Sequence, residues 1–77
     1  MNELYQQYKK QHKNAKEILD ILEKNRAEID FKLKSDPSNA NLHKDLRNVN
    51  MDIRITMNEI EHTEFRILEY ESNTISQ

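Results

Sequence analysis

The chain has 77 residues, of which 35% are hydrophobic and 34% are charged, and its formal net charge is −2. This length excludes more than one domain, and below roughly 70–80 residues a single core rarely supplies more than ~3–5 kcal/mol of stability. We therefore expect an oligomer or a partner protein to complete the fold. The small net charge and the regular hydrophobic spacing argue against disorder, and the absence of cysteine excludes disulfides and thiolate metal sites.

A first helix is predicted over residues 2–34. The segment contains no glycine and no proline, so nothing in it interrupts a helix. Apolar residues recur at helical spacing along it, which predicts one buried stripe, with charged residues on the other faces. The predicted stripe consists of Leu4, Tyr8, Ala15, Ile18, Leu22, Ile29 and Leu33, and Tyr5 and Leu19 widen it.

A turn is predicted over residues 35–41, around the only proline of the chain, Pro37. Proline disfavours a helical conformation at Asp36 and provides no N–H for a helix interior. Asp36, Ser38 and Asn39 all have side-chain oxygens that suit the N-cap of a following helix. The sequence does not distinguish between these three caps.

A second helix is predicted over residues 42–71, followed by a frayed tail over residues 72–77. Its apolar stripe consists of Leu42, Leu46, Val49, Ile53, Met57, Ile60 and Ile67, with Tyr70 near the end. This helix is the more acidic of the two: residues 35–77 have a net charge of −4, against +2 for residues 1–34. The opposite charges favour an antiparallel pairing of the two helices.

The two stripes match each other when the chain is folded at Pro37. The numbers of facing residues then add to about 75, which pairs Leu33 with Leu42, Ile29 with Leu46, Leu22 with Ile53, Ile18 with Met57, Ala15 with Ile60 and Tyr8 with Ile67. A constant register of this kind predicts an all-α fold, a single antiparallel two-helix hairpin of coiled-coil type over residues 1–77. The same register brings Asn25 opposite Asn50, either as a buried amide pair or with both side chains turned to water.

No catalytic or metal-binding pattern is present. His12 and His62 approach each other in the predicted register, but His43 lies at the other end, and metal sites usually need three or four ligands. Carboxylates two residues apart, such as Glu59 and Glu61, point to different sides of a helix. A hairpin also lacks the deep pocket of an enzyme. We therefore expect no enzymatic activity, no cofactor and no metal.

Nucleic acid and membranes are not the expected partners. The basic cluster at Lys9, Lys10, Lys13 and Lys16 lacks arginine and interleaved aromatic residues, and the chain as a whole is acidic. No apolar stretch approaches the ~20 residues that cross a bilayer, and the N-terminal residues do not resemble a secretory signal. The expected location is the cytoplasm.

A second set of apolar residues lies outside the predicted stripe of the second helix. Met51, Ile55, Phe65 and Leu68 follow their own helical spacing through Asn58 and His62, on roughly the opposite side, and Ile21 and Phe31 lie away from the stripe of the first helix. Aligned apolar residues that the hairpin cannot cover indicate an interface. Met51, Ile55, Phe65 and Leu68 are the predicted partner-binding residues.

The turn and its flanks, residues 34–46 (KSDPSNANLHKDL), resemble the inter-helix turn of type III secretion needle subunits, which are hairpins of similar length. The chain differs in having Ala40 where those subunits usually have a second proline, and its helices are more charged. It is also similar to the small needle co-chaperones of the same systems, which pair with a tetratricopeptide-repeat chaperone to keep the needle subunit soluble. The resemblance implies a co-chaperone or assembly factor of a bacterial type III secretion system.

Two other functions are compatible with a hairpin of this kind. One is a small homodimeric regulator, of the type that phages encode, which binds a transcription or replication protein. The other is a needle-like structural subunit. All three are interaction proteins without an active site.

Overall fold

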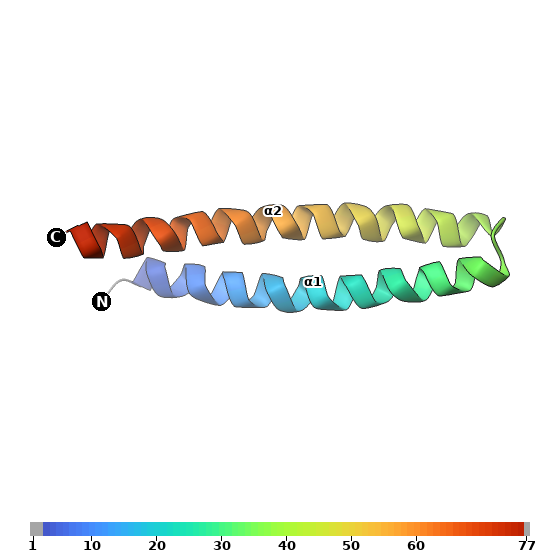
Figure 1. The fold of residues 1–77 in the computed structure, drawn as a ribbon, viewed down its shortest axis with the longest axis horizontal. Helices are drawn as coiled ribbons and strands as arrows, with labels where there is room; N and C mark the ends of the chain where they lie inside the picture. The colour runs from blue at the N-terminus through green and yellow to red at the C-terminus, as the bar shows by residue number, and fades with distance from the viewer. Residues whose placement is uncertain (1–2, 77) are drawn as a thin grey trace.

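The computed structural model confirms the all-α hairpin (Figure 1). It describes residues 3–76, with side chains up to residue 72. Helix α1 is Glu3–Ser35 and helix α2 is Ala40–Ser76, and the two lie side by side in opposite directions. The molecule is a rod of 59 × 14 × 14 Å. Glu3 in the first turn of α1 and Lys32 and Lys34 in its last turn complement the helix dipole.

The connection between the helices is shorter than the predicted turn. It consists of residues 36–39, because Ser35 still belongs to α1, and Ala40 and Asn41 already belong to α2. Asn39 is the N-cap: its Oδ1 accepts from the Leu42 N–H at 3.1 Å, while its Nδ2 donates to Asp36 Oδ2 at 2.9 Å. A backbone bond from the Asn39 N–H to the Asp36 carbonyl closes the turn around Pro37. Asn39 was one of the three predicted caps.

His43 fastens the start of α2 to this turn. Its Nε2 donates to the Pro37 carbonyl at 2.7 Å. A carbonyl oxygen only accepts, so Nε2 bears the proton in this contact. The turn is therefore held by side chains on both sides of the proline.

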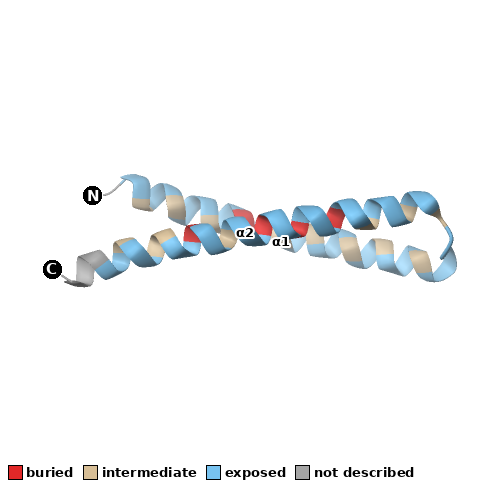
Figure 2. Cartoon of the chain, turned by 90° about the horizontal axis from the view of Figure 1, so that it is seen from above, coloured by how far each residue is buried: buried red, intermediate tan, exposed pale blue. Residues whose placement is uncertain are grey.

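Buried and half-buried residues alternate at intervals of three and four along both helices, which is the heptad pattern of a coiled coil. We call these residues the seam. The numbers of facing residues add to about 75, as predicted, and the most buried residues lie in the central part of the rod (Figure 2). On α1 the seam is Tyr5, Tyr8, His12, Ala15, Leu19, Leu22, Arg26, Ile29 and Leu33. On α2 it is Leu42, Leu46, Val49, Ile53, Thr56, Ile60, Thr63, Ile67 and Tyr70; Arg66 is also half-buried but lies outside this spacing.

One of the six predicted pairs is wrong. Ile18 and Met57 are each 50% exposed, and their neighbours Leu19 and Thr56 occupy that layer instead. Leu4 is likewise exposed, and Tyr5 takes its place. The reason is the period: a seam that continues to face its partner must average 3.5 residues per turn, and only the strict alternation of three and four achieves this.

Two threonines belong to the core, and the sequence analysis did not include them. Thr63 is 1% exposed, and its Oγ1 lies 2.9 Å from the Glu59 carbonyl and 3.1 Å from the Ile60 carbonyl. Thr56 Oγ1 donates to the Asp52 carbonyl at 2.8 Å. Because each hydroxyl bonds to its own helix, only the threonine methyl has to pack in the seam. Both residues therefore act as small apolar residues.

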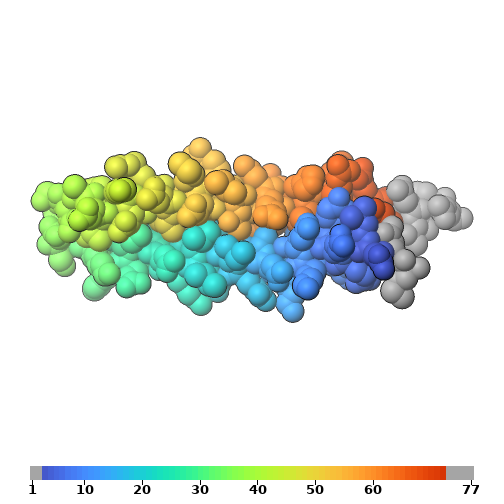
Figure 3. Space-filling model, turned by 180° about the vertical axis from the view of Figure 1, so that it is seen from behind, coloured from blue at the N-terminus to red at the C-terminus, as the bar shows by residue number. Residues whose placement is uncertain are grey.

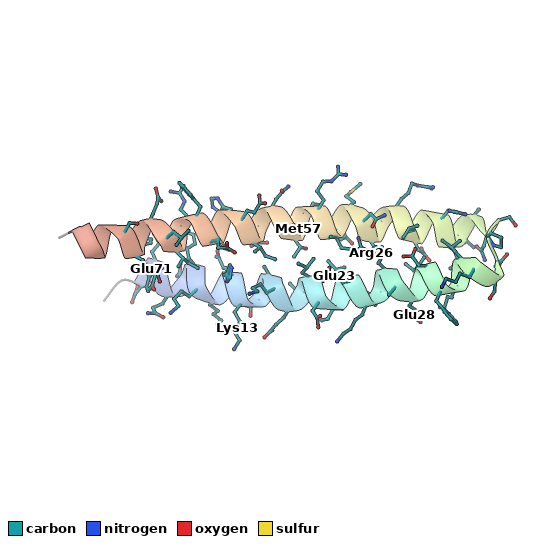
Figure 4. All side chains as sticks on the ribbon, in the orientation of Figure 1. Lys13, Glu23, Arg26, Glu28, Met57 and Glu71 are labelled. Atoms are coloured by element: carbon teal, nitrogen blue, oxygen red, sulfur yellow. The ribbon has the colours of Figure 1, made fainter. Side chains whose placement is uncertain are left out.

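The predicted amide pair in the seam is not formed. Asn25 and Asn50 are both exposed, which agrees with the second of the two arrangements that the sequence left open. Arg26, the next residue along α1, is the seam residue, and its Nη1 donates to Asn50 Oδ1 at 3.5 Å. Figure 4 shows the Arg26 side chain between the two helices.

The second helix is longer than predicted. It continues to Ser76, so residues 72–76 are helical, where the sequence suggested a frayed tail. Asn2, the predicted first helical residue, and Gln77 lie outside the described residues.

Candidate partner-binding surfaces

The four predicted partner-binding residues are all on the surface of α2. Met51, Ile55, Phe65 and Leu68 are 57–61% exposed. Met51, Ile55 and Phe65 share one line with Asn58 and His62, at intervals of four and three, on the side of α2 away from the seam, although the His62 ring extends back toward Tyr8 of α1. Leu68 lies about 60° around the helix from Phe65. The structure therefore brings three of the four residues together on one line, with the fourth beside its end.

This line of α2 is free of formal charge when histidine is neutral. It consists of Asn48, Met51, Ile55, Asn58, His62 and Phe65, and we call it the α2 outer stripe. It extends over about 26 Å of helix. Charged residues flank it, with Asp52 and Glu59 on one side and Arg54 and Glu61 on the other. An uncharged line with large apolar side chains, bordered by charge, has the composition of a helix interface.

The first helix has a comparable line, which the sequence analysis did not recognise. Ile18 is half exposed, and Ile21 is 57% exposed one turn further along. The line continues in both directions without a charged residue, at strict intervals of three and four. It consists of Leu4, Gln7, Gln11, Asn14, Ile18, Ile21 and Asn25, and we call it the α1 outer stripe. Assigning Leu4 and Ile18 to the seam concealed it, although the lack of charge at these seven positions is visible in the sequence.

Aromatic and polar contacts join the helices at their open end. The Tyr5 hydroxyl donates to Glu71 Oε2 at 2.9 Å, and the Tyr70 ring lies 5.9 Å from that of Tyr5 and 6.2 Å from that of Tyr8. The Lys9 ammonium lies 5.4 Å from the centre of the Tyr5 ring. The hydrogen bond to Glu71, loss of hydration and the Glu71 charge raise the pKa of the Tyr5 hydroxyl above its usual value.

The two histidines of the predicted register have different neighbours. His12 Nε2 lies 3.1 Å from Glu64 Oε2, whereas the His62 ring lies 6.5 Å from the ring of Tyr8. Within the described residues, no group of three or more histidine, cysteine and carboxylate side chains is placed to hold a metal ion.

The basic cluster of α1 does not pair with the acidic residues of α2. Among the described side chains, the ion pairs that involve lysine or arginine lie within one helix, and Glu64 is hydrogen-bonded across the hairpin to His12 instead. Lys13 points away from α2 (Figure 4). Without direct ion pairs to α2, the lysines contribute only a weak long-range attraction to the antiparallel arrangement, because salt screens exposed charges that are not in contact.

The depressions found over the described residues are shallow and open, and the face in Figure 3 has no deep hollow in its coloured part. One of 340 Å³ lies near the turn half, between Leu22, Ile29 and Val49, and its rim includes Glu28, Asp45 and Asp52. Another, of 420 Å³, lies beside Met57 and Arg26. Such surfaces suit the side of another helix better than an enclosed small molecule.

No protein family, no curated protein and no solved structure matches the chain. Neither helix, over the residues that the structure describes, has a stretch apolar and long enough to cross a bilayer.

Proposed function

We propose that this hairpin is a non-enzymatic interaction module that binds another protein through the α2 outer stripe and Leu68. The observation behind this proposal is the exposure of Met51, Ile55 and Phe65, three large apolar side chains that share one line and that the hairpin does not cover. Aromatic anchors surrounded by uncharged residues are typical of binding hot spots. The shape of the surface favours an amphipathic helix as the bound element.

In its specific form, the proposal is a cytoplasmic co-chaperone or assembly factor of a type III secretion system, which keeps a needle subunit soluble together with a tetratricopeptide-repeat chaperone. Its support is the similarity of residues 34–46 to needle-subunit turns. The structure adds that residues 36–39 of this segment form a tight connection, which is capped by Asn39 and contacted by His43 from the first turn of α2. The residues that resemble a known turn therefore form one here.

A double substitution tests the binding surface. Phe65→Ser together with Ile55→Ser should weaken partner binding at least tenfold, because losing two buried apolar side chains costs more than the ~1.4 kcal/mol that this factor requires. The assay is copurification and titration with the needle subunit and the tetratricopeptide-repeat chaperone encoded in the same genome. Helicity, measured by circular dichroism, should be nearly unchanged, since both side chains are exposed.

The matched control is Phe31→Ser together with Met57→Ser. These residues are also exposed, and they lie outside the α2 outer stripe. The control should bind like the natural chain. Equal loss in both double variants would contradict the assignment of the surface, and loss of helicity in the Phe65 and Ile55 variant would place those residues in the core. A genome without a needle subunit would rule out the secretion form of the proposal.

The second candidate is a small homodimeric regulator of a transcription or replication protein. The observation that favours it is the α1 outer stripe, because Ile18 and Ile21 offer a second surface besides the one on α2. A stable dimer of the isolated chain that copurifies with a transcription or replication protein supports this candidate, and stoichiometric copurification with a needle subunit supports the first.

A further inference from the structure

We propose that a second copy of this chain packs on the α1 outer stripe, with the two α1 helices antiparallel and Ile18 of one protomer facing Ile21 of the other. This inference specifies the contact that a homodimeric regulator requires, and it goes beyond the partner-binding function of the first candidate, because it concerns the other helix and leaves the α2 outer stripe of each protomer open to a partner. It rests on the self-complementarity of α1 in one register.

The apolar content of the stripe selects the register. When Ile18 faces Ile21 of the partner subunit, the numbers of facing residues add to about 39. The two-fold symmetry then gives a second layer, in which Ile21 faces Ile18 of the partner subunit. Four isoleucines then lie together at the centre of the contact. All four come from positions that are at least half exposed in the single hairpin.

The polar positions match in the same register. Asn14 faces Asn25 of the partner subunit, and Gln11 faces Glu28 of the partner subunit, so amide donors lie opposite oxygen acceptors on both sides of the isoleucine layers. Further out, Gln7 faces Lys32 of the partner subunit. No two like charges oppose each other along the stripe.

The charges beside the stripe are also complementary. Glu17, next to Ile18, flanks the α1 outer stripe on the side away from the seam. The register brings Glu17 beside Lys24 of the partner subunit, and the two-fold symmetry gives a second pair of the same kind. Lys24 contacts Asp20 of its own helix at 3.2 Å, and Glu17 forms no ion pair among the described side chains. One heptad further from the centre of the contact, Lys10 faces Phe31 of the partner subunit, as in a cation–π contact.

The α2 outer stripe lacks this self-complementarity. An antiparallel copy that places Met51 opposite Ile55 sets Asp52 beside Asp52 of the partner subunit. The register that pairs Ile55 with Phe65 instead sets Glu59 beside Glu59 of the partner subunit. Like charges across a helix contact oppose association. The two stripes therefore differ in occupant: α1 suits its own copy, and α2 suits a different protein.

Cysteine crosslinking tests the register directly. The variant with both Asn14→Cys and Asn25→Cys should form a disulfide-linked dimer under oxidation. The two cysteines cannot bridge within one chain, because eleven residues separate them by about 16 Å along a rigid helix, well beyond disulfide range. Each single variant should stay uncrosslinked at the same concentration, since the antiparallel register separates the two copies of either position by a similar distance.

The outcomes separate the possible arrangements. Crosslinking by the single Asn14→Cys variant would show parallel helices and overturn the proposal, and so would a double variant that remains monomeric. Denaturing electrophoresis with and without reductant gives the readout. Circular dichroism verifies that the variants are still helical.

Sedimentation equilibrium of the natural chain supplies the second test, which needs no cysteine. The chain should dimerise with concentration, and Ile18→Ser with Ile21→Ser should weaken the dimer at least tenfold. Glu17→Lys and Lys24→Glu should each weaken it, and the variant with both changes should recover most of the affinity, because the exchanged charges face each other again. The control Met51→Ser with Ile55→Ser should dimerise normally. A natural chain that is monomeric at every concentration, or a control that is as weak as the Ile18 and Ile21 variant, would overturn the proposal.

Discussion

The two halves of the seam are built from different residues. Between the turn and the layer of Leu22 and Ile53, the facing residues are aliphatic, apart from Arg26. From His12 to the chain ends, the seam consists mainly of tyrosines, a histidine and a threonine, with hydrogen bonds from Tyr5 to Glu71 and between His12 and Glu64. The first half is closed by the turn, and the second half is open at both termini (Figure 1).

This difference reflects two ways of holding helices together. Near the turn, the helices are already adjacent, so aliphatic burial alone stabilises their contact. At the open end, no connection joins the helices, and broad aromatic rings with polar tips cover apolar surface there, with Tyr5 bonded to the Glu71 carboxylate. We therefore expect the closed half to dominate the free energy of unfolding, and the open half to adjust it.

The largest expected effect is the loss of a buried aliphatic residue from the closed half. Ile53 is 6% exposed, and Ile53→Ala should lower the free energy of unfolding by ~2–5 kcal/mol. Ile67→Ala, at a half-buried position of the open half, should cost clearly less. Urea titration followed by circular dichroism measures both, with the exposed Ile55→Ala as the control. Equal losses at Ile53 and Ile67 would contradict the division into two halves.

Much of the fold could be predicted from the sequence. The helices, the turn at Pro37 and the register all follow from apolar spacing and from the rarity of helix breakers. The error at Ile18 and Met57 has a clear physical origin. Leu19 was placed at the edge of the predicted stripe instead of Ile18, and Met57 was preferred to Thr56 because it is apolar. In two supercoiled helices, the position along the heptad decides which residue is buried, even where a more apolar neighbour is available. A threonine whose hydroxyl bonds to its own helix is effectively apolar, and this is visible only once the backbone is in place.

The surfaces were less accessible to prediction than the fold. The apolar residues of the α2 outer stripe could be found, because they are separate from the seam in any register. The α1 outer stripe could not, because four of its seven positions are amides and Ile18 was counted as core. The identity of the protein that binds a surface depends on the sequence of that second protein. A single sequence indicates the binding partner only where a surface is complementary to a second copy of itself, as we propose for α1.

Thr63 offers an intermediate effect that separates its methyl from its hydroxyl. Thr63→Ser removes the buried methyl and should cost about 1 kcal/mol of unfolding free energy. Thr63→Val removes the hydroxyl but retains the volume, and should cost less or even stabilise the hairpin, because the Glu59 and Ile60 carbonyls remain bonded within the helix. Thermal melts of the two variants measure the order. If the valine variant were less stable than the serine variant, the Thr63 hydroxyl would contribute more to stability than its hydrogen bonds within α2 explain.

The smallest expected effect is a dependence on pH at the open end. In the folded chain the pKa of Tyr5 is raised, because its hydroxyl donates to the Glu71 carboxylate. A pKa raised by folding means that the protonated tyrosine stabilises the hairpin. This stabilisation is complete below the ordinary tyrosine pKa of about 10, and it is lost as the pH rises through the higher folded value.

Tyr5→Phe has no such group. The natural chain should therefore exceed the Tyr5→Phe variant in unfolding free energy by more at pH 8 than above pH 10, and the titration of lysines, common to both chains, cancels in the difference. Glu71→Gln retains a hydrogen-bond acceptor without the charge and should reduce the pH dependence. If the difference in unfolding free energy between the natural chain and Tyr5→Phe were the same at pH 8 and above pH 10, the Tyr5 hydroxyl would contribute no pH-dependent stability to the open end.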